Sequence, residues 1–207
     1  MSQEHRALYL MRHAEVETAY HRTFGGRIDM DISDQGVSQA KDLADYLRRH
    51  PFDSCFSSPM KRVIKTAAPH TEWTQASPTH LDGLREVDFG DWTGLKWEEV
   101  HEKHNQSAFD WLHLLEQNSI TNAEPIEAFS GRVESALNRI LAEENGSHIG
   151  VFCHGGVIRM LLALILKLPV FQMSSFEFNY ASVTVIHMKA SRPEVQLSNY
   201  CPWQHHK

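Results

Sequence analysis

Two apolar segments, each followed by a histidine, limit the possible folds of this sequence more than any other feature. The first segment, residues 7–11, carries no charge and stops at Arg12 and His13. The second, residues 148–153, stops at His154. Short apolar runs that end abruptly at polar residues are typical of buried strands in an α/β sheet. Because ligands bind at the carboxyl ends of such strands, we expect the two histidines to share one site.

The residues after His154 predict a helix start beside this site. Gly155 and Gly156 lead into an apolar helical pattern over residues 157–168. A helix that begins with glycines offers unobstructed backbone N–H groups and a positive dipole end, which favour an anionic ligand. Gly155 is therefore a candidate substrate-binding residue.

A third predicted strand brings a second arginine to the same edge. Residues 54–57 form a short buried-strand pattern, and Ser58 and Pro59 are the pair expected where a helix begins. Arg62 then falls in the first turns of that helix. Arg12 and Arg62 cannot lose their charge and present planar forks of donors, so together they predict a phosphate pocket.

An acidic loop at residues 83–94 provides a proton donor for chemistry in such a pocket. A neutral imidazole can attack phosphorus without a base, and a carboxylic acid must then protonate the departing alkoxide. Glu86 is the candidate acid, with Asp88 and Asp91 as competitors. The residue pattern alone leaves open whether His13 or His154 is the nucleophile.

The remaining segments predict one three-layer α/β/α domain over residues 1–203, with a mostly parallel central sheet and a helical insertion near the active site. Residues 204–207, which include His205 and His206, are expected to form a disordered tail. The other expected elements are a loop over residues 14–31, helices at 35–49, 96–104, 107–116 and 124–144, and strands at 79–81, 181–188 and 194–197.

Composition narrows the possible partners. A net charge of −6 on 207 residues argues against general nucleic-acid binding, which needs a surplus of Lys and Arg.

The most apolar window, residues 157–168, is too short to cross a bilayer. Three cysteines without paired spacing, and a polar N-terminus with no signal-peptide pattern, predict a cytoplasmic location. We therefore expect a small molecule as partner, with neither nucleic acid nor membrane, and the pattern sets no oligomeric state.

Four motifs in order resemble the histidine phosphatase (phosphoglycerate mutase-like) superfamily. Residues 10–15, Leu-Met-Arg-His-Ala-Glu, resemble its Arg-His-Gly-Glu signature, and residues 57–62 resemble its second motif. Residues 84–94 are similar to its acid-bearing loop and residues 152–156 to its last motif. Each motif alone is weak, whereas four in family order are specific. The resemblance covers nearly the whole chain.

The resemblance implies roles for the singled-out residues. It implies that His13 is the phosphorylated nucleophile, that Arg12, Arg62 and His154 hold the phosphoryl group, and that Glu86 is the acid/base. It also implies that neither a metal nor another cofactor is needed. The choice of His13 over His154 rests on the resemblance.

Some positions depart from the family pattern. Ala14 replaces the usual glycine, and Ala19 falls where many members carry a phosphate-contacting asparagine. Gly26, Arg22 and Arg27 are candidate substrate-binding residues that would rebuild this side of the pocket. The form of the acid loop resembles the phosphatase branch.

The leading interpretation is therefore a metal-independent phosphomonoesterase that hydrolyses small-molecule phosphate esters. Two alternatives stay open: a phosphoglycerate mutase-type phosphotransferase, and a catalytically idle module that binds phospho-ligands. Neighbouring Glu15 and Cys153 are interpreted as structural, and Trp92 and Trp97 as packing residues. The physiological ester, whether α-ribazole phosphate, a sugar phosphate or another, is not specified by these motifs.

Overall fold

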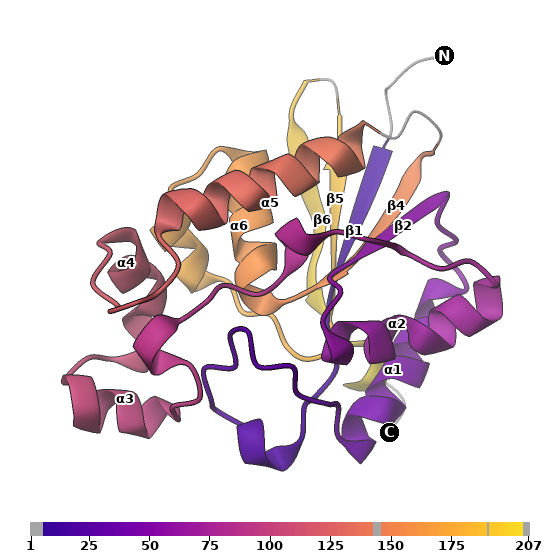
Figure 1. Ribbon diagram of the computed structural model, residues 1–207. Helices are drawn as coiled ribbons and strands as arrows, with labels where there is room; N and C mark the ends of the chain where they lie inside the picture. The colour runs from indigo at the N-terminus through magenta and orange to yellow at the C-terminus, as the bar shows by residue number, and fades with distance from the viewer. Residues whose placement is uncertain (1–5, 143–145, 190, 205–207) are drawn as a thin grey trace.

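Six strands form one sheet in the order β3-β2-β4-β1-β5-β6 (Figure 1). The computed structural model describes residues 6–142, 146–189 and 191–204. The strands β1 to β4 are mutually parallel. The strand β5 runs antiparallel to its neighbour β1, and β6 runs antiparallel to β5. This confirms the expected mostly parallel sheet. The strands are β1 (Arg6–Arg12), β2 (Ser54–Ser57), β3 (Thr79–His80), β4 (His148–Cys153), β5 (Val183–Met188) and β6 (Pro193–Tyr200).

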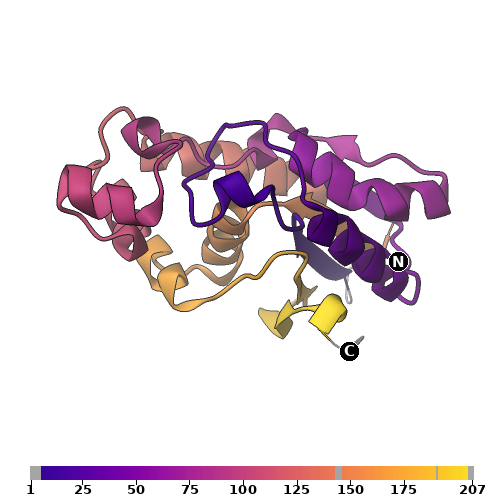
Figure 2. The same ribbon diagram turned by 90° about the horizontal axis from the view of Figure 1, so that it is seen from below.

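Helices cover both faces of the sheet, which makes the fold the three-layer α/β/α arrangement expected from the sequence (Figures 1 and 2). Alternate residues of β1 point to opposite faces, so Leu8 and Leu10 belong to one core cluster and Tyr9 and Met11 to the other. The helices are α1 (Asp34–Leu47), α2 (Lys61–Thr74), α3 (Trp97–His104), α4 (Trp111–Glu116), α5 (Ile126–Leu141) and α6 (Gly155–Leu166).

The two core clusters show which helices form which layer. The cluster around Leu8 and Leu10 includes the apolar stripes of α5 and α6, and the cluster around Tyr9 and Met11 includes those of α1 and α2. The helices α3 and α4 form the inserted region and lie to one side of the sheet (Figure 1). Among the described residues, no helix combines the length and the apolar character needed to cross a membrane.

The register of β1 and β4 places the site. Arg12 pairs with Cys153 in a parallel ladder, so the two strands end side by side. The backbone N–H of His13 donates to the Cys153 carbonyl at 3.0 Å. His13 and His154 therefore leave the sheet at the same edge, as expected from the two apolar segments.

Several predicted boundaries were wrong. α2 begins at Lys61 with Met60 as its cap, so Ser58 and Pro59 precede the helix instead of starting it. β5 begins at Val183 because Ala181 adopts a positive φ of 50° in a turn before it. Among the other helices, α1 ends at Leu47 instead of residue 49, and α6 begins at Gly155 instead of residue 157. A 3-10 turn, Ala108–Asp110, precedes α4, and α5 is shorter than the expected 124–144. The strand β6 extends to Tyr200 instead of ending at residue 197.

The expected tail is described only in part. Gln204 ends the 3-10 helix Pro202–Gln204 and so belongs to the folded domain. The other residues of the predicted disordered tail, 205–207, lie outside the described residues.

Candidate active site

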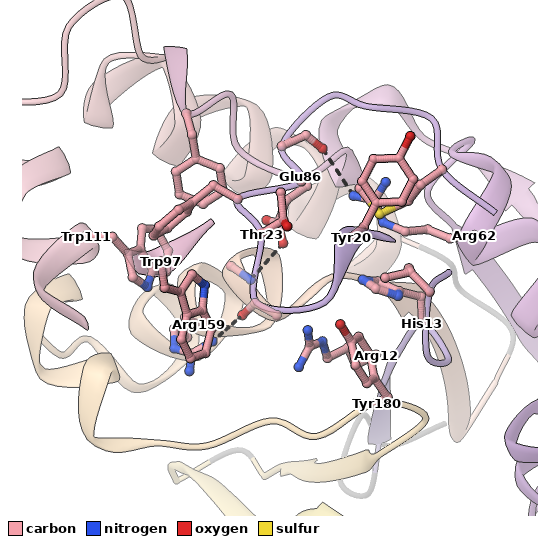
Figure 3. A pocket seen from close by; sticks show the side chains of 18 residues that line it. Arg12, His13, Tyr20, Thr23, Arg62, Glu86, Trp97, Trp111, Arg159 and Tyr180 are labelled. Atoms are coloured by element: carbon pink, nitrogen blue, oxygen red, sulfur yellow. Dashed lines mark hydrogen bonds between the residues drawn. The ribbon is translucent and has the colours of Figure 1, made fainter. Parts of the chain in front are cut away.

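A cleft of about 190 Å³ opens at the carboxyl ends of the parallel strands (Figure 3). Its walls come from the end of β1, the loop after it, the start of α2, the acidic loop and the start of α6. The candidate residues from the sequence that line it are Arg12, His13, Gly26, Arg62, Glu86 and Gly155. Segments that are far apart in the chain thus converge on one small cavity.

His13 is held with one ring nitrogen bare. Its Nδ1 lies 2.8 Å from the carbonyl oxygen of Ala14, and a carbonyl can only accept a hydrogen bond. The proton of the neutral ring therefore sits on Nδ1, which leaves a lone pair on Nε2. Burial, and then the charges of Arg62 and Arg12, hold the pKa of His13 well below its usual 6.5. The imidazole is thus neutral at neutral pH.

His154 lies beside His13 but does not itself line the cleft. Its side chain is fully buried, and the two ring centroids are 5.3 Å apart. The Nε2 atom of His154 pairs with the Ser58 hydroxyl at 2.9 Å. Burial, followed by the charge of Arg62, lowers its pKa well below 6.5. His154 thus lies directly behind the cleft wall, and a role in holding the phosphoryl group stays a prediction.

Two arginines place positive charge near His13. Arg62 is 2% exposed, and its Nη1 and Nη2 donate to the carbonyls of Ile28 at 2.8 Å and Gly26 at 3.1 Å. Arg12 donates to the Phe178 carbonyl at 2.5 Å and stacks on a tyrosine ring. Neither forms an ion pair within the described part of the chain. Burial lowers the pKa of Arg62 to about 10, so it stays cationic.

Glu86 is the acidic residue among those that line the cleft. Its Oε2 accepts from the backbone N–H of Gly156 at 3.2 Å, and its Oε1 accepts from Val87 at 3.1 Å. A Cβ on Gly156 would lie 2.4 Å from Glu86 Oε1, so only glycine leaves room for this contact. The competing acids serve elsewhere: Asp88 accepts from a neighbouring backbone N–H, and Asp91 accepts from an asparagine at the surface.

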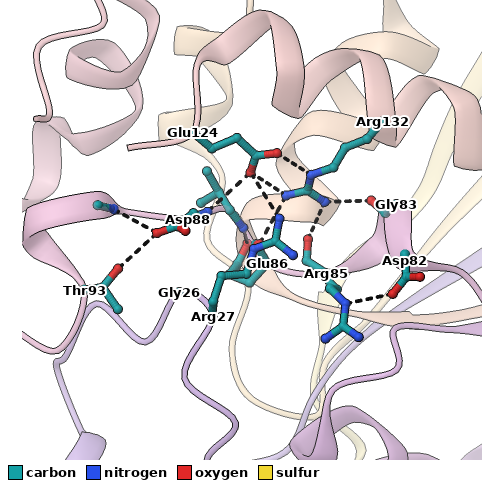
Figure 4. A network of polar contacts seen from close by, with 12 residues as sticks. Gly26, Arg27, Asp82, Gly83, Arg85, Glu86, Asp88, Thr93, Glu124 and Arg132 are labelled. Atoms are coloured by element: carbon teal, nitrogen blue, oxygen red, sulfur yellow. Dashed lines mark hydrogen bonds and ion pairs between the residues drawn. The ribbon is translucent and has the colours of Figure 1, made fainter. Parts of the chain in front are cut away.

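Arg132 of α5 holds the acidic loop from behind (Figure 4). It donates to the carbonyls of Gly83 at 2.8 Å, Arg85 at 2.6 Å and Glu86 at 3.2 Å. Its other donors form two bonds to the carboxylate of Glu124, at 2.6 Å and 2.7 Å. Sequence reasoning missed Arg132, because it lies in an amphipathic helix where an arginine carries no motif.

Two of the arginines offered as pocket residues lie outside the cleft. Arg22 has a positive φ of 56° and pairs with Glu98 at 2.7 Å at the surface. Arg27 pairs with Glu124 at 3.6 Å, behind the acidic loop. Neither lines the cleft, because each guanidinium is engaged by a carboxylate on the outer side of its loop. Gly26 does line it, with a φ of 45° that presents its carbonyl to Arg62.

The structure adds cleft residues that sequence reasoning missed. Arg159, on α6, lines the cleft beside Trp97, whereas Trp97 was expected only to pack. Trp92 is 1% exposed and packs in the core as expected. One signal in the sequence was available for Arg159, since it lies near the start of an apolar helical pattern whose other charged residue, Lys167, lies near the end. The other missed lining residues include Tyr20, Thr23, Trp111 and Tyr180.

The three cysteines are free thiols without a metal-binding arrangement. Cys153 is fully buried, and burial raises the pKa of its thiol above the usual range. Burial also raises the pKa of Cys55 to about 12. Within residues 6–142, 146–189 and 191–204, no group of three or more His, Cys, Asp and Glu side chains is placed to hold a metal ion. Glu15, which was expected to be structural, accepts from the Ser33 hydroxyl at the start of α1.

Proteins of known sequence or known structure are similar to this chain. Phosphoserine phosphatase 1 of Hydrogenobacter thermophilus is 31% identical over 185 residues, covering 89% of this chain and 88% of that protein. The adenosylcobalamin/alpha-ribazole phosphatase of Salmonella typhimurium is 30% identical over 162 residues, covering 78% and 80%. The crystal structure of the alpha-ribazole phosphatase from Shigella flexneri matches with a TM-score of 0.81 at 24% identity, over 93% of this chain and 96% of that one, and so shares the fold.

A family model also matches almost the entire chain. The model described as "Histidine phosphatase superfamily (branch 1)" matches residues 8–200. This span contains all four motifs and every residue that lines the cleft. The chain therefore belongs to the histidine phosphatase superfamily, branch 1.

Proposed function

We propose that this protein hydrolyses small-molecule phosphate esters through a phosphohistidine formed on His13. Membership of the histidine phosphatase superfamily, together with relatives named as phosphatases, makes it a phosphoric monoester hydrolase. The observation that carries the proposed mechanism is the bare Nε2 of His13 in a cleft where Arg12 and Arg62 have no carboxylate partner among the described residues.

In the first step, the lone pair on His13 Nε2 attacks phosphorus and the bond to the ester oxygen breaks. Arg12 and Arg62 neutralise charge on the non-bridging phosphoryl oxygens, which is the main requirement of phosphoryl transfer. Glu86, in its protonated form, gives its proton to the departing alkoxide. The Nδ1–H of His13 continues to donate to the Ala14 carbonyl, so the phosphorylated ring keeps its orientation.

In the second step, water attacks the phosphohistidine. Glu86, now a carboxylate, accepts a proton from that water while the bond between phosphorus and Nε2 breaks. The products are inorganic phosphate, a neutral His13 and a protonated Glu86, ready for another cycle. The hydrogen bond from Gly156 keeps the carboxylate at the helix start in both steps.

The two alternatives would use the same cleft in other ways. A phosphoglycerate mutase-type enzyme would return the phosphoryl group to a second hydroxyl instead of water. An idle module would bind a phosphorylated ligand without forming a covalent bond. The carboxylate of Glu86 in the cleft favours turnover over mere binding, because a pure anion site gains nothing from a negative side chain.

The test is phosphate release from p-nitrophenyl phosphate and from an alkyl phosphate, with and without a chelator. We expect His13→Ala to abolish release from both, while the matched surface variant His101→Ala keeps wild-type turnover. Glu86→Gln should slow the alkyl ester by about 100-fold or more, since that leaving group needs a proton. With p-nitrophenyl phosphate the same variant should show a burst, followed by slow hydrolysis of a phosphoenzyme.

The outcomes separate the three functions. Undiminished release by His13→Ala would exclude the phosphohistidine mechanism. Transfer to a phosphoglycerate without net phosphate release would point to a mutase. Tight binding of inorganic phosphate without any turnover would point to an idle module.

A further inference from the structure

The ring of Tyr180 lies over Arg12 in the cleft, and the proposed mechanism gives this ring no role. The guanidinium carbon of Arg12 is 4.3 Å from the centroid of the Tyr180 ring. The same ring approaches the imidazole of His13, with the two centroids 5.6 Å apart and the ring planes inclined by 48°. Tyr180 lines the cleft, and Figure 3 shows it beside both residues. One aromatic side chain therefore lies against the nucleophile and against an arginine next to it.

The guanidinium of Arg12 has few other groups to hold it in place. Its Nη1 donates to the Phe178 carbonyl at 2.5 Å. Its Nε is buried without a hydrogen-bond partner in the part of the chain that the structure describes. Among the described residues, no carboxylate forms an ion pair with it. One carbonyl fixes one corner of the planar group, so the tilt of the plane depends on the ring of Tyr180.

The backbone that carries Tyr180 is bonded to the site itself. The Tyr180 carbonyl accepts from the indole Nε1 of Trp203 at 2.8 Å. The next residue, Ala181, has a φ of 50° and donates its backbone N–H to the carbonyl of His13 at 3.1 Å. Because these bonds come from two directions, the ring is supported by backbone that cannot move independently of the nucleophile.

A ring in this place can prepare an arginine for an anion. An aromatic face attracts a guanidinium through the ring quadrupole, and the attraction is strongest where water is excluded. An arginine side chain has many rotamers, and ordering them on binding weakens the binding of a ligand. A guanidinium that is already ordered loses less freedom, and the ring uses none of its N–H donors. The donors that do not reach Phe178 stay available to phosphoryl oxygens.

We propose that Tyr180 is a positioning residue, whose ring face holds the guanidinium of Arg12 in the orientation that binds the transferred phosphoryl group. This inference rests on the proposed function, because it takes Arg12 to hold that group. Tyr180 acts through Arg12 and through its ring, and its hydroxyl is not required.

The test is a titration with inorganic phosphate followed by 31P NMR, which detects weak binding and does not depend on turnover. Tyr180→Leu should raise the Kd for phosphate roughly 3- to 30-fold, the range expected when a partly desolvated cation–π contact is lost. Tyr180→Phe keeps the ring and should stay within about twofold of wild type. Trp73→Leu is the matched control, because Trp73 lies over Arg48 away from the cleft, and it should leave the Kd unchanged.

A double-mutant cycle shows whether the loss passes through Arg12. In an Arg12→Gln background the cation is absent, so Tyr180→Leu should change the Kd for phosphate by less than about twofold. In an Arg62→Gln background Tyr180→Leu should keep its full effect, because Arg62 does not stack on this ring. A general loss of structure would weaken binding in both backgrounds alike.

A second substitution guards against a folding defect of the leucine variant. Tyr180→Met introduces a flexible apolar chain without an aromatic face and should weaken phosphate binding as Tyr180→Leu does, with circular dichroism showing that the variants are folded. An unchanged Kd in both variants, or an equal effect in the two arginine backgrounds, would overturn the role of the ring. An equal loss in Tyr180→Phe would assign the effect to the hydroxyl and overturn it as well.

Failure of the proposed function would look different. Wild type would then release no phosphate from p-nitrophenyl phosphate, and no phosphohistidine would be trapped, whatever the Kd values for inorganic phosphate. The binding measurement therefore tests Tyr180 separately from the chemistry at His13.

Discussion

The Nδ1 of His13 and the carbonyl oxygen of Ala14 are 2.8 Å apart, a contact that fixes which ring nitrogen carries the proton. The protonation of this ring also determines how the enzyme should respond to acid. Protonating His13 removes the Nε2 lone pair, so activity through this group is lost as pH falls through its pKa. Burial and the charges of Arg62 and Arg12 lower that pKa well below 6.5.

We therefore expect His13 to stay neutral around pH 6.5, where an ordinary imidazole gains a proton. Protonation of His13 should not lower kcat/KM in this range. Arg12→Gln removes one positive neighbour and should raise the pKa of His13. The measurement is an NMR titration of the His13 ring in both proteins, which does not depend on turnover. A wild-type ring that titrates at 6.5 or above would contradict this account.

Arg132 should act on catalysis through Glu86. Arg132→Met removes the donors that hold the Glu86 backbone, so proton donation to the leaving group becomes less well oriented. We expect kcat to fall about 10- to 100-fold for an alkyl phosphate and much less for p-nitrophenyl phosphate, whose leaving group needs no proton.

Arg132→Lys provides the control for lost charge. It keeps a cation near Glu124 and should recover stability more than it recovers kcat, because lysine cannot reach three carbonyls at once. A fall in kcat that is the same for both leaving groups would show that Arg132 only stabilises the fold.

The space at Gly156 should be required for activity. Gly156→Ala places a Cβ 2.4 Å from Glu86 Oε1, so the carboxylate must move away from the helix start. We expect kcat to fall at least about tenfold, as measured by steady-state kinetics on an alkyl phosphate. Gly131→Ala on α5 is the matched control: its Cβ would meet nothing within 4 Å, so activity should hold and stability should rise by up to about 1 kcal/mol. Wild-type kcat in Gly156→Ala would refute the close contact.

Stability should fall in mild acid, partly because of His70. This side chain is 3% exposed between Phe52 and Phe152, and burial lowers its pKa below 6.5. Below pH 6.5 the unfolded chain takes up a proton that the native ring refuses, so the free energy of unfolding falls as pH falls from 6.5 toward the native pKa.

His70→Phe should flatten this dependence by at most about 1.4 kcal/mol per pH unit without changing kcat. Urea unfolding at pH 7 and pH 5, for wild type and variant, measures the difference. An unchanged slope would show that folding does not lower the pKa of His70.

The elements nearest the chemistry were predictable because their signals are local. The apolar run before His13, the run before His154 and the glycines after it are each readable within about ten residues. Strand periodicity and turn residues act over the same range. Helix ends were less predictable: α2 starts after Pro59 instead of at it, and the Ser58 hydroxyl pairs with His154, which follows a different strand.

The fold class, the edge of the sheet where the site lies and the candidates Arg12, His13, Arg62 and Glu86 all follow from the residue pattern of the chain. The folded structure was needed to show that His154 lies behind His13, that Arg132 holds the acidic loop and that Arg159 faces the cleft while Arg22 does not. Residue type sets what a side chain can do, whereas the charges around it and the space it occupies depend on segments brought together by folding.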